Sequence, residues 1–243
     1  RVFVKFYIIT YLFLYYTFIL FAQNQEYQQK FEELYRDIER YGISNDWLKE
    51  NLDNKNFLIY QEIPKLFSNM AENRVKKSEL TLQDYMNNFD IASKVKRGLE
   101  FIKDNNDLLN KVESRNGIHK ELIISILAIE TNFGSKKYFG NFYLFPTLVT
   151  QYILMPERAN FALRELQYLY LLKLFRAIDY SYIKGSFAGA VGLGQFIPSS
   201  IFNFFVDTDM NDDDLDIFAM DDNIASIENY LFKHGLNSKT MDD

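Results

Sequence analysis

The apolar residues of this chain recur at helical spacing along most of its length. This spacing is seen at residues 27–38, 81–115, 161–175 and 224–231. The first stretch ends near Gly42, and Asn116-Gly117 stops the longest one, as expected for helix ends. Strand-like alternation is scarce, and the chain has only four prolines. The sequence therefore predicts an all-α fold, with residues 53–77 as its least regular part.

The most apolar helix after the N-terminal segment ends in a carboxylate. Apolar residues at positions 122, 123, 126, 127 and 129 follow one helical face, and Gly134 is a stop signal. Glu130 closes this helix, so we expect its carboxyl to be partly desolvated. Desolvation raises the pKa of a carboxyl and suits it to donate a proton near neutral pH. The alternative is that Glu130 faces solvent and merely caps the helix or pairs with a cation.

A second unusual stretch covers residues 185–200 and holds four of the ten glycines of the chain. Glycine permits positive φ angles and close approach of the backbone, so this segment is shaped for a purpose. It contains Gln195-Phe196, an amide beside an aromatic face, which is a common way to hold a sugar. The alternative is that the small residues let two helices pack closely.

The two stretches occur in a recognisable order. A helix that ends Glu130-Thr131-x-Phe133-Gly134 is followed by Gly-Ser-x-Ala-Gly-Ala-x-Gly-x-Gly-Gln-Phe-x-Pro-Ser-Ser at residues 185–200. This order resembles the membrane-bound lytic murein transglycosylase B family of the lysozyme-like superfamily. Residues 155–159 and 226–230 resemble two further motifs of that family. The resemblance covers roughly residues 85–236.

The resemblance implies a lysozyme-like domain that cleaves the β-1,4 bond between N-acetylmuramic acid and N-acetylglucosamine in peptidoglycan. It implies that Glu130 protonates the bridging oxygen and then deprotonates the muramoyl C6 hydroxyl, which closes a 1,6-anhydro ring. No cofactor is required for this chemistry. The implied substrate-binding residues are Ser186, Gln195, Phe196, Arg158 and Tyr230. For Tyr230, an ordinary core aromatic is an equal alternative.

Two other functions stay open. A hydrolysing lysozyme would share Glu130 but would need a second carboxylate in the cleft. A non-catalytic peptidoglycan-binding or scaffold protein would keep the cleft without the reaction. The sequence departs from the family at Glu157, where an arginine is usual, and at Pro146, where an aspartate is usual. Relatives continue past the position of Asp243, so we expect a domain that is incomplete at its C-terminal side or closes its cleft differently.

An acidic stretch offers candidate metal ligands. Every second residue from 207 to 213 carries a side-chain oxygen: Asp207, Asp209, Asn211 and Asp213. This alternation matches the first ligands of an EF-hand-type loop for Ca²⁺, and the resemblance implies Asp222 as the closing ligand. Asp212 and Phe218 stand where such a loop has glycine and glutamate. A structural calcium ion, a sodium ion and a solvated loop without an ion are the alternatives.

The charge balance and the cysteine content exclude several classes of function. The net charge of −6 argues against nonspecific nucleic-acid binding and gives no overall attraction to an anionic polymer. The chain has no cysteine and two histidines, His119 and His234, so disulfides are excluded, and a zinc site or a Ser-His-Asp triad is disfavoured.

The N-terminus reads as a targeting segment. Basic residues Arg1 and Lys5 precede an uncharged apolar run, Phe6 to Ala22, which is typical of a secretory signal and also near the length of a membrane anchor. A buried core helix is the less favoured alternative. The predicted organisation is a signal or anchor at 1–22, an N-terminal helical region at 23–80 and a lysozyme-like catalytic domain at 81–243. We expect an exported, periplasmic monomer that acts on peptidoglycan glycan strands, with any membrane association through Phe6–Ala22.

Overall fold

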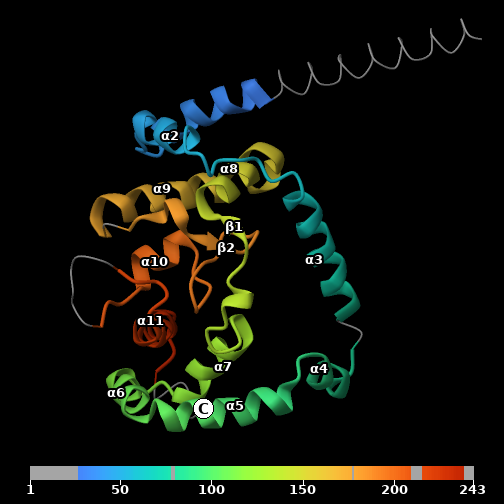
Figure 1. Ribbon diagram of the computed structural model, residues 1–243, viewed down its shortest axis with the longest axis vertical. Helices are drawn as coiled ribbons and strands as arrows, with labels where there is room; N and C mark the ends of the chain where they lie inside the picture. Colours follow the sequence, from blue (N-terminus) through green and yellow to red (C-terminus); the bar gives the residue numbers. More distant parts are fainter. Residues whose placement is uncertain (1–26, 78–79, 177, 209–214, 238–243) are drawn as a thin grey trace, which may run out of the picture.

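The computed structural model describes residues 27–77, 80–176, 178–208 and 215–237 (Figure 1). Helices dominate these residues, which confirms the all-α prediction. The only paired strands among them are β1 (Phe142–Tyr143) and β2 (Lys184–Gly185), which run antiparallel with Phe142 opposite Gly185. The predicted signal or anchor at 1–22 lies outside the described residues. No helix within the described part has the length and apolar character needed to cross a membrane.

The helices follow one another along the chain, and the longest connections precede α8, α10 and α11. A first helix covers residues 27–40. After it come α2 (Asn45–Leu52), α3 (Ile63–Lys77), α4 (Leu82–Asn88), α5 (Ile91–Asp104), α6 (Asn106–Asn116), α7 (Lys120–Glu130), α8 (Leu144–Leu154), α9 (Ala159–Arg176), α10 (Pro198–Phe204) and α11 (Met220–Lys233). Short 3-10 turns are η1 (Lys136–Tyr138), η2 (Pro156–Arg158) and η3 (Tyr180–Tyr182).

The upper half of the molecule in Figure 1 is built around α8 and α9. Helix α8 is buried on all sides, and the N-terminal helices cover it from above. Trp47 of α2 packs edge-to-face on Phe145 with ring centroids 5.5 Å apart, and its indole N–H donates to the hydroxyl of Tyr180. The Tyr152 hydroxyl donates to Asp37 at 2.8 Å. The N-terminal helices therefore share one hydrophobic core with α8 and α9.

The lower half of the molecule is built around α7. This helix packs against α5, α6 and α11, and its Ile123 and Leu127 are fully buried. It ends at Glu130 because the chain then turns away through three consecutive residues with positive φ: Asn132, Phe133 and Gly134. The chain therefore leaves the helix axis directly after Glu130.

A separate arm is formed by α3. Its first turns pack Ile63 against Met155 and Tyr60 in a small second core, and the helix then runs down to α4 at the edge of the molecule (Figure 1). This helix lies in the stretch that shows the least regular sequence pattern. The pattern is weak because one end of α3 packs on the body, so few positions need to be apolar.

A buried carboxylate joins α9 to α10. Glu165 is 0% exposed, and it accepts hydrogen bonds from the backbone N–H and the hydroxyl of Ser199 at 2.8 and 3.0 Å. Arg164 donates to the same carboxylate at 3.1 Å. A buried charge is tolerated when donors surround it in this way. Glu165 therefore sets the position of the first turn of α10 relative to α9.

We expect Glu165→Ala to lower the free energy of unfolding by about 1–3 kcal/mol, because it leaves the N–H of Ser199 without its acceptor. The matched control is Glu157→Ala, an exposed glutamate in η2, which should change the value by less than about 0.5 kcal/mol. Urea unfolding of both variants measures the difference. Equal stability of the two variants would contradict this role of Glu165.

Candidate active site

A cavity of about 410 Å³ opens beside the end of α7. Its lining comes from α7, from the segment before α10, from α10 and from α11: Ile126, Glu130, Gly194, Gln195, Phe196, Ile197, Ser200, Ile227, Tyr230 and Leu231. Four of the six predicted catalytic and substrate-binding residues meet here, namely Glu130, Gln195, Phe196 and Tyr230. They come from three parts of the chain that lie far apart in the sequence.

The carboxyl of Glu130 is the only acidic group among the described residues that line this cavity. It is exposed on its open side, but the surrounding side chains remove enough water to raise its pKa above the ordinary value. No side chain in the described ranges forms a hydrogen bond or an ion pair with it. A carboxyl in this setting holds its proton to higher pH than a solvated glutamate.

Two buried polar side chains clamp the glycine-rich segment against α7 and α11. The hydroxyl of Thr131 donates to the carbonyl of Leu193 at 2.7 Å, directly after Glu130. Asn223 of α11 accepts from the backbone N–H of Gly194 at 3.0 Å. Its amide also donates to the carbonyls of Ile217 and Ala219, at 2.9 and 2.7 Å. Both side chains are fully buried, so the clamp is shielded from water.

Gly192 shows why this segment needs glycine. Its φ is +76°, and a Cβ placed there would lie 2.5 Å from the carbonyl oxygen of Ile217. Only glycine fits a backbone that combines this conformation with so close a neighbour. The sharp turn at Gly192 lets the chain reverse, so that Phe196 pairs with Val191 through two backbone hydrogen bonds of 2.9 Å.

Gln195 lies at the tip of this reversal with a φ of 51°, and its amide donates to the carbonyl of Gly192 at 2.9 Å. Phe196 is buried and packs edge-to-face on Phe205 and Tyr230, at 5.8 and 6.1 Å between ring centroids. Phe196 therefore forms the wall of the cavity and supports its neighbours, whereas Gln195 stands at the surface of the cavity.

Tyr230 belongs both to the cavity and to an aromatic cluster. It lines the cavity, stacks on the ring of His234 at 4.1 Å and meets Phe204 edge-to-face at 5.2 Å. The alternative of a core aromatic therefore describes one side of this ring, and the cavity-lining role describes the other.

The structure does not bring Ser186 and Arg158 to this cavity. The hydroxyl of Ser186 accepts from the backbone N–H groups of Ala188 and Ala190 at 3.3 and 3.1 Å, which closes a tight turn after β2. The guanidinium of Arg158 lies 4.3 Å from the ring centroids of both Phe67 and Phe161. Burial between these rings lowers the pKa of Arg158.

Arg158 instead ties the arm to the glycine-rich segment. Its Nε donates to the side-chain oxygen of Gln151 at 2.9 Å, and the amide of Gln151 donates to the carbonyl of Phe187 at 2.9 Å. Phe187 in turn packs edge-to-face on Phe67 of α3 with ring centroids 5.0 Å apart. These contacts fix α3 beside the start of the glycine-rich segment.

The candidate metal ligands are described only in part. Asp209, Asn211 and Asp213 lie outside the described residues. Asp222 is 6% exposed, and its Oδ1 accepts from the backbone N–H and the hydroxyl of Thr208 at 2.9 and 2.7 Å. Thr208 directly follows Asp207, so these contacts hold the start of the acidic stretch against α11.

The sequence patterns missed Asn223, although it holds the glycine-rich segment in place. A signal existed in the sequence, because a polar residue stands among the apolar positions of α11 that face inward. That signal alone does not say which backbone group the side chain meets. Ser200 and Ile227 also line the cavity; they lie within the motifs at 185–200 and 226–230, but the sequence patterns did not single them out as site residues.

Comparison with known proteins identifies the family of this chain. The family model of the transglycosylase SLT domain matches residues 26–241, and the chain belongs to this family. The chain is 29% identical over 219 residues to the membrane-bound lytic murein transglycosylase B of Escherichia coli K12, a match that covers 88% of this chain and 58% of that protein. The chain thus spans less than two thirds of this relative.

Solved structures show the same fold. The soluble lytic transglycosylase SltB1 of Pseudomonas aeruginosa matches with a TM-score of 0.69 and 28% identity, over 84% of this chain and 66% of that one. The Escherichia coli lytic transglycosylase Slt35, solved in complex with calcium, matches with a TM-score of 0.66 and 27% identity, over 88% of this chain and 64% of that one. These matches confirm the lysozyme-like transglycosylase fold.

We expect Ile126→Ser to lower the pKa of Glu130 toward its ordinary value. Ile126 lines the cavity one helical turn before Glu130, and a smaller polar side chain there admits water to the carboxyl. The measurement is an NMR titration of the glutamate side-chain carboxyl carbons. The control is Ile129→Ser, because Ile129 lies on the same helix but lines a different pocket. A pKa unmoved by Ile126→Ser would show that desolvation is not the cause.

Proposed function

We propose that this protein is a lytic transglycosylase that cleaves the β-1,4 bond between N-acetylmuramic acid and N-acetylglucosamine of peptidoglycan. The observation that carries the proposal is the partly desolvated carboxyl of Glu130. It is the only acidic group in the described lining of a cavity that Gln195 and Tyr230 also line. Family membership supports the same reaction.

The reaction needs one group that first gives and then takes a proton. Protonated Glu130 donates its proton to the bridging oxygen, and the bond between that oxygen and C1 of the muramoyl residue breaks. The C6 hydroxyl of the same residue attacks C1, and its proton passes to the Glu130 carboxylate. The product is a 1,6-anhydro ring, water is not consumed, and Glu130 is again protonated. An internal nucleophile gains a high effective concentration, so no second carboxylate is needed to activate water.

The raised pKa of Glu130 serves the first step. Below its pKa the carboxyl is protonated and competent as an acid, and a raised pKa extends this state toward neutral pH. Gln195 stands at the cavity surface with an amide that can both donate to and accept from a sugar. In the proposal Gln195 and Tyr230 hold the glycan, and Phe196 supports both side chains. Ser186 and Arg158 contribute to substrate binding from outside this cavity.

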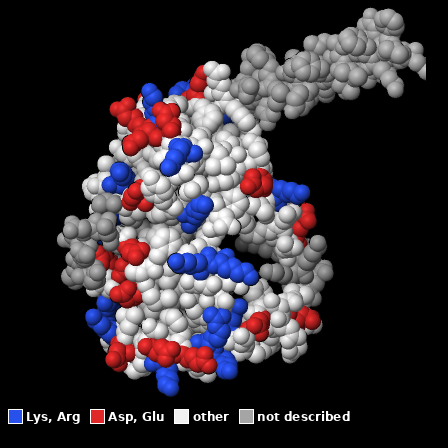
Figure 2. Space-filling view, viewed as in Figure 1, with Lys and Arg blue, Asp and Glu red and all other residues white. Residues whose placement is uncertain are grey.

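The charges on one face of the molecule favour the binding of an anionic polymer. Figure 2 shows lysine and arginine side chains at the border of a hollow in this face. Exposed Lys184 lies 4.6 Å from the ring centroid of Tyr143, and Lys137 lies 5.9 Å from that of Tyr138. No aspartate or glutamate occurs in residues 131–156 or 180–206, although the net charge is −6. Lysines on aromatic faces suit the carboxylates of peptidoglycan stem peptides, so we propose peptide-bearing glycan strands as the substrate.

The proposal also includes the location and the assembly state. Peptidoglycan lies outside the cytoplasm, so the enzyme is exported to the periplasm, with Phe6–Ala22 as its signal or anchor. It works as a monomer, and residues 23–80 and 81–243 form the N-terminal and catalytic regions.

A structural calcium ion is part of the proposal. The ligands would be the carboxylates and the amide oxygen of Asp207, Asp209, Asn211, Asp213 and Asp222. All are hard oxygen donors, which Ca²⁺ prefers. Asp222 fits this task, because Thr208 holds its buried carboxylate beside the acidic stretch. Both hydrogen bonds from Thr208 go to the same oxygen, Oδ1. The ion would brace the connection between α10 and α11 and takes no part in the reaction.

We expect Ca²⁺ to raise the melting temperature of the protein relative to a sample in chelator, because it binds only the folded state. Asp222→Asn should remove most of this rise. Asp221→Asn changes the neighbouring carboxylate and should keep the rise. Differential scanning calorimetry with and without Ca²⁺ measures all three proteins. If Asp222→Asn responds to Ca²⁺ like the unaltered chain, the assignment of the site is wrong.

We expect Glu130→Gln to lower the rate of peptidoglycan cleavage by about 10²–10⁴-fold, since it removes the acid and base while keeping the shape of the side chain. The control is Glu121→Gln on the same helix, which should cleave normally. Mass spectrometry of the soluble products is the measurement, and 1,6-anhydromuramic ends are expected. Reducing ends would instead show a hydrolase, and the absence of products from folded protein would show a binding protein.

A further inference from the structure

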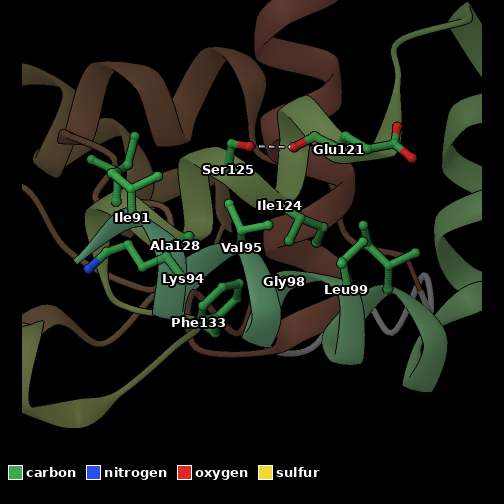
Figure 3. A pocket seen from close by; sticks show the side chains of 12 residues that line it. Ile91, Lys94, Val95, Gly98, Leu99, Glu121, Ile124, Ser125, Ala128 and Phe133 are labelled. Atoms are coloured by element: carbon green, nitrogen blue, oxygen red, sulfur yellow. Dashed lines mark hydrogen bonds between the residues drawn. The ribbon is translucent and has the colours of Figure 1, made fainter. Parts of the chain in front are cut away.

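A second pocket lies on the side of α7 that faces α5, away from Glu130. Its volume is about 270 Å³, and Figure 3 shows the side chains that line it. The two helices run in opposite directions, so Ile91 lies near Ala128 and Leu99 near Ile124 (Figure 3). Along α5 the lining extends from Ile91 to Ile102, which is about 16 Å at the rise of an α-helix. The pocket is thus long, narrow and mostly apolar.

Gly98 keeps this pocket open. It lies in the middle of α5, where glycine destabilises a helix relative to alanine. Its φ is not positive, and a Cβ would meet Ile124 and Phe133 only at 3.8 Å, an ordinary contact distance. Neither the backbone conformation nor crowding therefore requires glycine here. A larger side chain at position 98 would fill the pocket, so the glycine preserves an empty apolar space.

Charge is distributed unequally along the pocket. Lys94 lies at one end, and Arg97 stacks on Phe133 of the lining with its guanidinium carbon 4.9 Å from the ring centroid. Glu121 lies at the other end and points outward (Figure 3). Helix α5 carries four basic and two acidic residues in a chain whose net charge is −6. The open rim is apolar as well, because Val95, Leu99 and Ile129 are 56%, 64% and 62% exposed.

We propose that the pocket between α5 and α7 binds an acyl chain with an anionic head group. The chain lies along the apolar floor at Gly98, and the carboxylate or phosphate head meets the ammonium group of Lys94 at one end. Attraction at that end and repulsion by Glu121 at the other fix the direction of the ligand. This inference is independent of the reaction proposed for Glu130, because Ile126 and Glu130 line the opposite side of α7.

The first test titrates the full chain with sodium dodecanoate and with dodecyltrimethylammonium, each below its micelle concentration, by isothermal titration calorimetry. We expect one dodecanoate per chain and much weaker binding of the cationic compound. Equal binding of the two compounds, or no binding of dodecanoate, overturns the proposal.

Gly98→Leu should abolish dodecanoate binding, because the new side chain occupies the pocket. Its melting temperature should equal or exceed that of the unaltered chain, since leucine favours a helix interior. Should this variant fail to fold, Leu99→Ser removes a wall of the pocket instead. Its matched control is Leu174→Ser on α9, a leucine that is 55% exposed and far from the pocket in sequence. Unchanged binding in Gly98→Leu, or equal losses in the two serine variants, overturns the proposal.

Lys94→Gln should weaken dodecanoate binding by about two- to fivefold, as expected for one partly exposed ion pair. Lys96→Gln is the control, because it removes the same charge from the same helix outside the lining. Flotation with vesicles of phosphatidylcholine, with or without phosphatidylglycerol, identifies the source of the chain. If the unaltered chain binds phosphatidylglycerol vesicles and Gly98→Leu does not, the acyl chain comes from a bilayer lipid. If the unaltered chain binds dodecanoate but not these vesicles, the ligand is a free fatty acid. Equal weakening by Lys94→Gln and Lys96→Gln overturns the assigned direction.

Discussion

The hydrogen bond from the hydroxyl of Thr131 to the carbonyl of Leu193 holds the candidate site together. It joins the residue after Glu130 to the glycine-rich segment, and it is fully buried, where an unmade bond would cost most. Asn223 grips the next residue, Gly194, from α11. Glu130 and Gln195 therefore keep their relative positions only while α7, the glycine-rich segment and α11 remain locked together. The rigid geometry of the cavity depends on a few polar bonds inside an apolar core.

The sequence predicts the helical fold because each helix that packs on the core needs apolar residues at helical spacing, and that spacing is visible without coordinates. The resemblance to the family implies that Glu130, Gln195, Phe196 and Tyr230 belong to one cleft, and these four residues do line one cavity. The roles of these residues remain predictions. Asn223 shows the limit of this approach, because a polar residue on an inward face announces a hydrogen bond but not its partner.

Arg158 and Ser186 show a second limit. Their motifs predict the cleft, yet the position of a side chain depends on contacts between distant segments. Arg158 lies between Phe161, three residues away, and Phe67 of α3, which has no sequence pattern that foretells its approach. Ser186 uses its hydroxyl to close its own turn. A local hydrogen bond determines where the Ser186 hydroxyl lies, and aromatic contacts determine where the Arg158 guanidinium lies. The spacing of apolar residues in the sequence predicts neither kind of contact.

Helix α7 separates two different environments within one helix diameter. On one side Ile126 and Glu130 line a cavity with mixed polar and apolar groups, and on the other side Ser125, Ala128 and Ile129 line an apolar pocket. An apolar helix is required between them, because the carboxyl must lose water on one face while the other face contacts α5. On the face toward α5, Ile129 is 62% exposed beside Gly98. Val95 and Leu99 of α5 are exposed beside it, so a bound acyl chain would remove a continuous apolar surface from water, and this burial is the physical basis of the proposed ligand site.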